Sequence, residues 1–320
     1  MKLFDAHCHL QDPRIFSKAS QLIAMALDSG VVRFAVNGVS ENDWHLVKQM
    51  SESYSSIIPC FGLHPWYVAE RTPNWLDTLK QFFETTPSAA VGEIGLDKGS
   101  RGREIHFMDQ VEVFEQQLNL AKELGRPASI HCVHAFGDLL QIMQRMGPFP
   151  AGIILHSYMG SAEMVPEFAK LGSYFSFSGF LMAMEARKAK RILKMVPSER
   201  FLLETDAPDA FPKSKLDSLR LVEGDSSLKE LQVRESISIS NIATLSCTGR
   251  DVSALPQGTL NHPANILHVL SYIASLMEMN KEELAEELLW QLASLYVRLD
   301  LRLPISGVAL HLELGTQRAL

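Results

Sequence analysis

The chain has 320 residues, 46% of them hydrophobic, so it is long enough to bury a large core and is neither disordered nor fibrous. Its 30 basic and 37 acidic side chains give a formal net charge of -7, which argues against a protein that holds a polyanion through a bulk positive field. It does not exclude an enzyme that binds metal ions in a small cleft.

The cysteines and the N-terminal residues indicate the cellular compartment of the protein. The 4 cysteines are scattered and none forms a Cys-x-x-Cys pair, which favours a reducing, intracellular environment. Asp5, His7 and Arg14 stand where a signal peptide needs an apolar run, and no segment is apolar over the length of a membrane span. We expect a soluble cytoplasmic or nuclear protein without membrane contact, and no obligate protein partner is evident.

Short runs typical of β-strands alternate with longer segments of helical period. The expected strands are 2–9, 31–38, 57–64, 89–97, 128–132, 152–157, 173–179 and 200–208. Helices are expected at 17–28, 41–53, 74–84, 104–124, 136–146, 162–170 and 183–195, and later at about 264–277 and 281–298.

Repeats of strand then helix, with central strands apolar on both faces, indicate an α/β fold of the (β/α)8 TIM barrel type. An open doubly wound sheet would ordinarily carry a glycine-rich phosphate loop after its first strand, where this chain reads AHCHLQDP. One barrel domain over residues 1–300 is sufficient to account for the expected strands and helices. We expect a polar inserted loop at about 211–258 and a C-terminal tail at 301–320.

The first expected strand carries two histidines with a shared direction. His7 and His9 are two residues apart, so their side chains lie on one face of the strand. Neutral imidazoles bind borderline divalent metals well, and a pair of them makes half of a metal site. By itself the pair is equally consistent with two ordinary, partly buried histidines.

Other strand ends carry residues of the same kind. Glu93 ends the fourth expected strand, His131 the fifth, His156 the sixth and Asp206 the eighth. The C-terminal ends of barrel strands ring one mouth, where the active sites of this architecture lie. Together with the histidine pair, these residues predict a single metal-binding cleft.

The size of this set suggests more than one ion. Six ligands exceed what one tetrahedral ion needs, and two ions about 3.5 to 4 Å apart could share them through a bridging carboxylate. Glu93 is the candidate bridge. Asp206 could bind one ion and accept a proton from the attacking water.

Two further carboxylates precede these candidates by two residues. Asp5 and Glu204 lie on the same strand faces as His7 and Asp206. Each could orient a neighbouring imidazole, or could be an ordinary buried polar group satisfied by the backbone.

Cations and aromatic residues near the expected mouth each have a structural and a functional interpretation. Arg101, after the fourth strand, could touch a phosphate, but a solvated loop charge is the more frequent case. The basic run 187–191 is more typical of the solvent-exposed face of its helix than of a nucleic-acid patch. Trp66 and Tyr67 could stack a base or pack the rim.

Taken together, the motifs resemble the TatD family of metal-dependent deoxyribonucleases within the amidohydrolase superfamily, and the resemblance covers nearly the whole chain. Six motifs in the family's order carry it: DAHCH (5–9), GLHP (62–65), GEIGLD (92–97), IHC (130–132), HS (156–157) and ETDAP (204–208).

The resemblance implies a (β/α)8 fold and a site for two divalent metal ions, for which Mg, Mn and Zn are candidates. It also implies hydrolysis of phosphodiester bonds in DNA, at strand ends or in single strands, as a 3′-5′ exonuclease. His64 matches a family position that faces the phosphate. Carried over position by position, the first ion would be held by His7, His9 and Asp206 and the second by His131 and His156, with Glu93 bridging.

The chain departs from the family's pattern in two places. The family usually has Asn-Glu-Pro before its last barrel helix, and here the residues are Asn261, His262 and Pro263. The insert at about 211–258 is also longer than the family's usual connection, which leaves the route of substrate access open.

Three functions follow in order of preference. The first is a divalent-metal-dependent hydrolase of ester bonds, a deoxyribonuclease with Asp206 and Glu93 as its catalytic residues. The second is a metal-dependent hydrolase of small esters, amides or lactones, because nearly the same ligands serve all of these reactions. The third is an inactive adaptor barrel, against which the intact ligand set argues.

Overall fold

The computed structural model describes residues 1–225 and 258–296. Eight parallel strands lie side by side in chain order, each paired with the next. They are β1 (Leu3–Cys8), β2 (Val31–Asn37), β3 (Ile57–Phe61), β4 (Ala90–Asp97), β5 (Ala128–Val133), β6 (Ile153–Leu155), β7 (Ser173–Phe177) and β8 (Phe201–Leu203).

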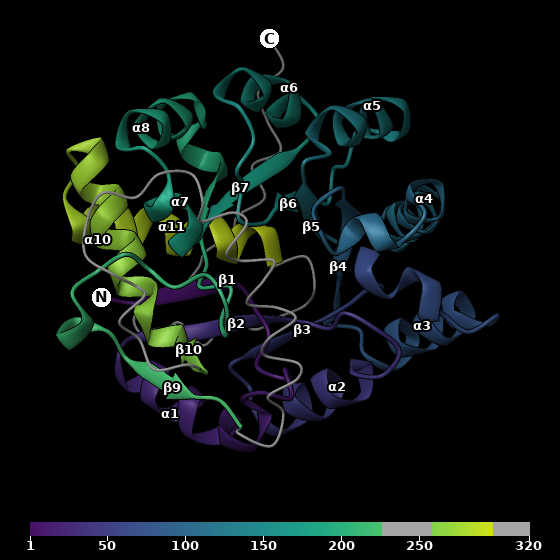
Figure 1. The fold of residues 1–320 in the computed structure, drawn as a ribbon, viewed down its shortest axis with the longest axis horizontal. Helices are drawn as coiled ribbons and strands as arrows, with labels where there is room; N and C mark the ends of the chain where they lie inside the picture. The colour runs from purple at the N-terminus through teal and green to yellow at the C-terminus, as the bar shows by residue number, and fades with distance from the viewer. Residues whose placement is uncertain (226–257, 297–320) are drawn as a thin grey trace, which may run out of the picture.

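The two edges of this sheet meet just beyond β8. The backbone N–H of Asp206 donates to the carbonyl of His7 at 2.9 Å, and the N–H of His9 donates to the carbonyl of Ala207 at 2.7 Å. Figure 1 shows the strands at the centre with the helices around them. The arrangement confirms the predicted (β/α)8 TIM barrel.

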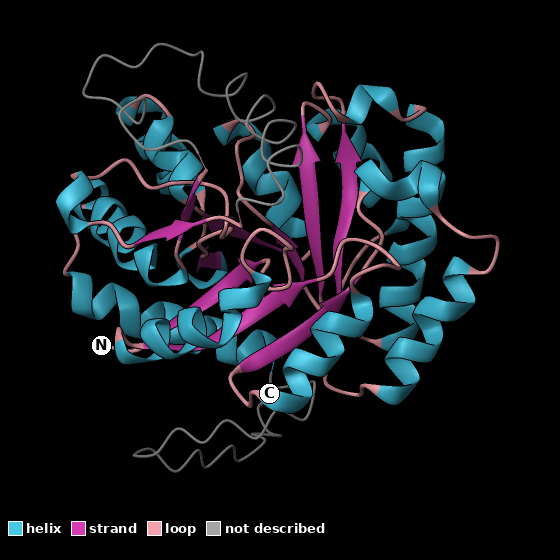
Figure 2. Ribbon diagram, turned by 60° about the horizontal axis from the view of Figure 1, so that its bottom comes forward, coloured by secondary structure: helices cyan, strands magenta, loops and turns pink. Residues whose placement is uncertain are grey.

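Helices cover the outside of the barrel (Figure 2), and each buries one apolar stripe. In α3, for example, the buried side chains are Trp75, Leu79 and Phe83, four residues apart on one face. None of the described helices is long and apolar enough to cross a membrane. The helices between strands are α1 (Ala19–Asp28), α2 (Trp44–Ser53), α3 (Trp75–Thr85), α4 (Phe107–Leu124), α5 (Phe136–Met146), α6 (Val165–Lys170), α7 (Gly179–Ala183) and α8 (Ala186–Met195), and α10 (Ile266–Met277) and α11 (Lys281–Tyr296) follow the last strand.

Apolar side chains fill the end of the barrel where the strands begin. Phe4, Ile58 and Leu202, each near the start of its strand, form one buried cluster with Leu295 and Tyr296 from the end of α11. The rings of Phe4 and Tyr296 stack with centroids 5.6 Å apart. Because this end is closed by apolar packing, polar chemistry is confined to the opposite mouth.

The structure adds elements that the sequence did not predict. A short helix, α7, precedes α8, where a single helix at 183–195 was expected. In addition, β9 (Leu221–Glu223) pairs antiparallel with β10 (Thr259–Asn261). Segments of three to five residues are too short to show a period. Most of the predicted insert at 211–258 and the whole tail at 301–320 lie outside the described residues, so the domain division stays a prediction.

One glycine allows β4 and β5 to approach closely at the mouth. Gly95 has a φ of +152°, a conformation that residues with a side chain rarely adopt. A Cβ atom at this position would lie 2.0 Å from the carbonyl oxygen of His131. The absence of a side chain at Gly95 therefore positions His131, which pairs with it across the two strands.

We expect Gly95→Ala to lower the free energy of unfolding by more than about 2 kcal/mol, because the methyl group would meet backbone in an unfavourable conformation. Gly137→Ala is the matched control, since a Cβ there meets nothing within 4 Å and alanine is favoured in a helix by up to about 1 kcal/mol. Urea unfolding followed by circular dichroism measures both. Equal stability of the two variants would contradict the steric role of Gly95.

Candidate metal centre

The residues predicted from the strand ends meet at the open mouth of the barrel. Five of them border a cavity of about 460 Å³, and His7 lies fully buried beside them. The five are His9, Glu93, His131, His156 and Asp206. The sequence prediction that these side chains share one cleft is therefore matched by their positions.

Glu93 lies at the centre, and each of its carboxylate oxygens faces a different pair of imidazoles. Oε2 is 3.4 Å from Nε2 of His7 and 3.2 Å from Nε2 of His9. Oε1 is 3.0 Å from Nδ1 of His131 and 2.9 Å from Nε2 of His156. Such a carboxylate is placed to contact two cations, one on each side.

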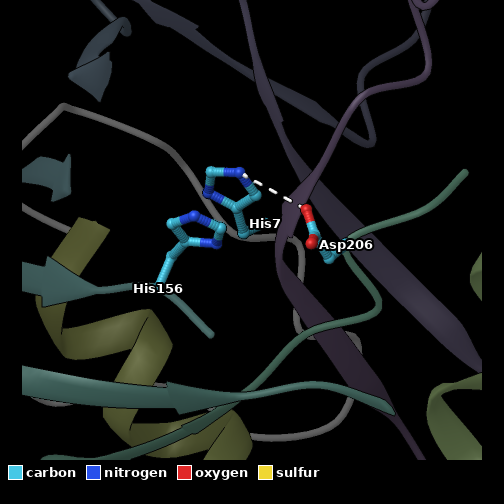
Figure 3. Close-up of side chains that lie close together, drawn as sticks. All are labelled: His7, His156 and Asp206. Atoms are coloured by element: carbon cyan, nitrogen blue, oxygen red, sulfur yellow. Dashed lines mark ion pairs between the residues drawn. The ribbon is translucent and has the colours of Figure 1, made fainter. Parts of the chain in front are cut away.

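Asp206 lies on the side of the first pair. Its Oδ1 is 3.6 Å from Nε2 of His9 and 3.9 Å from Nε2 of His7. Figure 3 shows this carboxylate directed at His7, whose ring stacks on that of His156 with centroids 4.0 Å apart. Asp206 has a φ of +51°, a strained conformation for a residue other than glycine. The turn after β8 holds this strain and directs the carboxylate into the mouth.

The outward nitrogens of three of the histidine rings have acceptors. Nδ1 of His9 donates to the carbonyl oxygen of Asn37 at 2.8 Å, and Nδ1 of His7 lies 2.8 Å from Oγ of Ser129. Nε2 of His131 lies 3.2 Å from Oδ2 of Asp97. With a proton retained on each outward nitrogen, the nitrogen that faces Glu93 is the one whose proton a bound cation would displace. Metal-binding histidines are held in this way, so the donor set fits divalent ions.

His64 differs from the other histidines in its hydrogen bonding. Its Nδ1 accepts the backbone N–H of Trp66 at 3.2 Å, and its Nε2 lies 3.4 Å from Oε1 of Glu93. Burial lowers the pKa of His64 to about 4, so the ring is neutral and its proton is on Nε2. Although this nitrogen lies near Glu93 and His131, it presents an N–H to the cavity. That favours a contact with a substrate oxygen over metal ligation.

Glu93 stays ionised among these rings. Burial acts to raise its pKa, but the surrounding imidazoles, that of His156 first among them, outweigh burial and hold the pKa well below its ordinary value. Ligation of a divalent cation requires the ionised carboxylate. The cluster therefore keeps its central group in the form that binds a metal.

Of the two neighbouring carboxylates, only one approaches a histidine ring. Oε1 of Glu204 lies 3.4 Å from Nδ1 of His156 and accepts the N–H and O–H of Ser157, each at 2.6 Å. Asp5 instead accepts the backbone N–H of Thr205 at 2.8 Å, and burial raises its pKa to about 8. Glu204 matches the orienting interpretation, and Asp5 matches the ordinary buried polar group.

Asp97 is the residue that the sequence interpretation left without a role. Its Oδ2 contacts His131 and also accepts the indole N–H of Trp66 at 2.5 Å. Burial acts to raise the pKa of Asp97, but the hydrogen bond from His131 and other contacts lower it to about 2. The sequence spacing could have identified Asp97 as a site residue, since it lies four residues after Glu93 on the same face of β4.

Comparison with known proteins identifies the relatives of this barrel. The family model described as TatD related DNase matches residues 4–296. An uncharacterized metal-dependent hydrolase of Bacillus subtilis, YabD, is 33% identical over 212 residues, which cover 66% of this chain and 82% of that protein. Human deoxyribonuclease TATDN3 is 26% identical over 225 residues, which cover 67% of this chain and 81% of that protein.

The solved structures agree on the fold. The structure of YJJV, a TatD homolog from Escherichia coli, superposes with a TM-score of 0.72 at 24% identity. The superposition covers 92% of this chain and 97% of the other. A TatD family hydrolase from Entamoeba histolytica gives a TM-score of 0.71 at 18% identity and covers 92% and 98%.

We expect Asp97→Asn to weaken the binding of Mn²⁺ or Zn²⁺ by about 10-fold to 100-fold, the usual effect of changing a group that orients a ligand imidazole. An amide holds the N–H of His131 less firmly than a carboxylate does. Asp138→Asn is the control, because Asp138 is partly exposed and pairs with Lys98 at 2.7 Å. Competition with a metal-binding dye measures the affinities. Unchanged affinity in Asp97→Asn would show that Asp97 does not support a ligand.

Proposed function

Because this chain belongs to the family of TatD-related DNases, we propose that it is a deoxyribonuclease that hydrolyses phosphodiester bonds of DNA from 3′ ends. It is a metal-dependent hydrolase that acts on ester bonds. The observation that carries the finer proposal is the position of Glu93, whose two oxygens each face a separate pair of imidazoles.

The proposed division of ligands follows these pairs. His131 and His156 would hold one ion, His7 and His9 with Asp206 the other, and Glu93 would contact both. Bound there, the ions would activate a water and neutralise charge on the phosphate. The imidazole-rich set favours Mn or Zn over Mg, which prefers oxygen ligands and retained water.

The protein's own side chains perform the remaining steps. Asp206 is only 7% exposed at the edge of the cavity, where its carboxylate can accept the proton of the attacking water. His64 presents its Nε2–H to a non-bridging phosphate oxygen. The buried floor around Glu93 keeps bulk water from competing with these contacts.

The names of relatives support a nucleic acid as the substrate. Several proteins similar to this chain are named 3'-5' ssDNA/RNA exonuclease TatD, among them one from Pantoea that is 28% identical over 216 residues. A cavity of about 460 Å³ that opens on the mouth can take a single nucleotide at the end of a strand. We therefore propose strand ends or single strands as the substrate.

The purified protein with Mn²⁺ or Zn²⁺ is expected to shorten 5′-labelled single-stranded DNA from its 3′ end faster than it hydrolyses small esters, amides or lactones. Asp206→Asn should lower kcat by at least about 100-fold, the scale of a lost general base. Gel electrophoresis of the products and kinetics on the small-molecule panel make the comparison. Turnover of the panel without cleavage of DNA would establish the small-substrate hydrolase instead, and full activity of Asp206→Asn would remove its assigned role.

Metal analysis by mass spectrometry should find two ions per chain in protein purified without chelator. His131→Ala should lose about one of them, because a two-histidine ligand pair is broken. His45→Ala is the control, because His45 is exposed on α2. An equal metal content in both variants would contradict the assignment of His131, and a protein with neither metal nor turnover would match the inactive adaptor.

A further inference from the structure

Two glutamines lie on the buried, otherwise largely apolar face of α4. Gln110 is 1% exposed and Gln117 is fully buried. They are seven residues apart, which places them on the same face of the helix, two turns or about 10 Å from each other. An amide without hydrogen-bond partners costs free energy in such a setting. The partners of these two side chains therefore show which parts of the barrel α4 holds.

Gln117 pairs with the backbone of Leu63, the residue before His64. Its Oε1 accepts the N–H of Leu63 at 2.7 Å, and its Nε2 donates to the carbonyl oxygen of the same residue at 3.0 Å. The backbone N–H of His64 in turn donates to the carbonyl oxygen of Val39 at 2.9 Å. These contacts fix the backbone from which the ring of His64 reaches Glu93 and the cavity.

Gln110 pairs in the same way with the backbone of Asp97. Its Oε1 accepts the N–H of Asp97 at 2.9 Å, and its Nε2 donates to the carbonyl oxygen of Asp97 at 3.1 Å and to that of Gly102 at 2.8 Å. The side chain of Asp97 contacts His131 and Trp66. Gln110 therefore fixes the end of β4 from which this carboxylate reaches the site.

The pairing of β3 with β4 explains why a helix supplies these contacts. The register of the two strands ends at Phe61 and Val91, and Leu63 and Asp97 lie beyond that point, toward the mouth. Buried backbone N–H and C=O groups need partners there. A glutamine side chain offers the same donor and acceptor as a peptide group. The two amides of α4 thus take the place of a strand partner where the mouth opens.

We propose that Gln110 and Gln117 are positioning residues of the active site. Gln117 sets the place of His64, whose Nε2–H is directed at the substrate. Gln110 sets the place of Asp97 beside His131. Both glutamines are buried and lie away from the lining of the cavity, so each acts through the backbone that it holds. The role of Gln117 rests on the proposed function, because it acts through the contact of His64 with the substrate.

Methionine tests each role, since it keeps the length of glutamine but offers no amide. Gln116→Met is the matched control, because Gln116 is a half-buried residue of the same helix whose Nε2 lies 3.5 Å from Oε1 of Glu112. Gln117→Met is expected to lower kcat on single-stranded DNA about 10-fold to 100-fold with KM changed by less than about twofold, the effect of a misplaced contact at the reacting centre. The kinetics of Gln116→Met should match those of the wild type.

A double-mutant cycle with His64→Ala separates positioning from a general loss of structure. If Gln117 acts through His64, Gln117→Met should change kcat by less than about twofold in protein that already carries His64→Ala. Gln117→Glu keeps an acceptor for the N–H of Leu63, so its kcat should lie between those of the wild type and Gln117→Met, and it replaces Gln117→Met in the cycle if that variant does not fold. Losses that multiply in the double variant, or a kcat of Gln117→Met equal to that of the control, would overturn the role of Gln117.

Metal affinity tests Gln110 without any need for turnover. Gln110→Met should weaken the binding of Mn²⁺ about threefold to tenfold, less than the change expected for Asp97→Asn. The loss should disappear in protein that already carries Asp97→Asn, and Gln116→Met should bind Mn²⁺ as the wild type does. Competition with a metal-binding dye measures all of these affinities. An unchanged affinity in Gln110→Met, or an equal loss in both backgrounds, would overturn the role of Gln110.

The ring signals of the histidines separate the role of Gln117 from the proposed function. In NMR spectra of the full chain with isotope-labelled histidine, the signal of His64 is identified by its loss in His64→Ala. It should shift in Gln117→Met and stay in place in Gln116→Met. Such a shift in a protein that fails to cleave DNA would support the positioning role and refute the nuclease proposal alone. An unshifted signal in Gln117→Met would overturn the positioning role even if DNA were cleaved.

Discussion

Glu93 carries a carboxylate that is 2% exposed at the centre of the barrel mouth. An unpaired buried carboxylate costs several kcal/mol, and here imidazole nitrogens of five histidines lie within 3.4 Å of its oxygens: His7, His9, His64, His131 and His156. The rest of the site follows from this constraint. Each ring must direct one nitrogen at Glu93 and satisfy the other nitrogen elsewhere, so the segments behind the rings have to supply hydrogen-bond partners at the correct distance.

The supporting groups explain why this end of the barrel is built from unusual backbone. Gly95 has no side chain, which allows the backbone of β5 to approach and His131 to lie between Glu93 and Asp97. Asp206 is held in a strained conformation beyond β8. Strained backbone of this kind persists only where the surrounding structure holds it in place. The buried apolar cluster around Phe4 and Tyr296 at the opposite end of the barrel supplies packing that is independent of the site. Stability and chemistry are thus divided between the two ends of one barrel.

The formal charge of -7 has a counterpart at the mouth, whose lining holds more carboxylates than cations. Acidic residues around the cavity are engaged by protein partners: Asp12 and Asp209 by Arg14, and Asp97 by His131 and Trp66. On α8, outward cations pair with glutamates while Lys188 borders the cavity. Lys188 therefore places a positive charge at the edge of a mouth whose lining holds more carboxylates than cations, and surface charges are screened beyond about 8 Å at physiological salt.

The sequence by itself determined the barrel and the list of clustered residues. Strand and helix periods differ, so their alternation is visible along the chain, and parallel strands bring their C-terminal ends to one mouth whatever the details of packing. That is why His7, His9 and Glu93 could be grouped in advance. Only the tertiary structure decided which ring nitrogen faces inward, that His64 presents an N–H, that Asp97 contacts His131, and that Lys188 borders the cavity. These depend on contacts between residues distant in sequence, and no spacing along the chain records them.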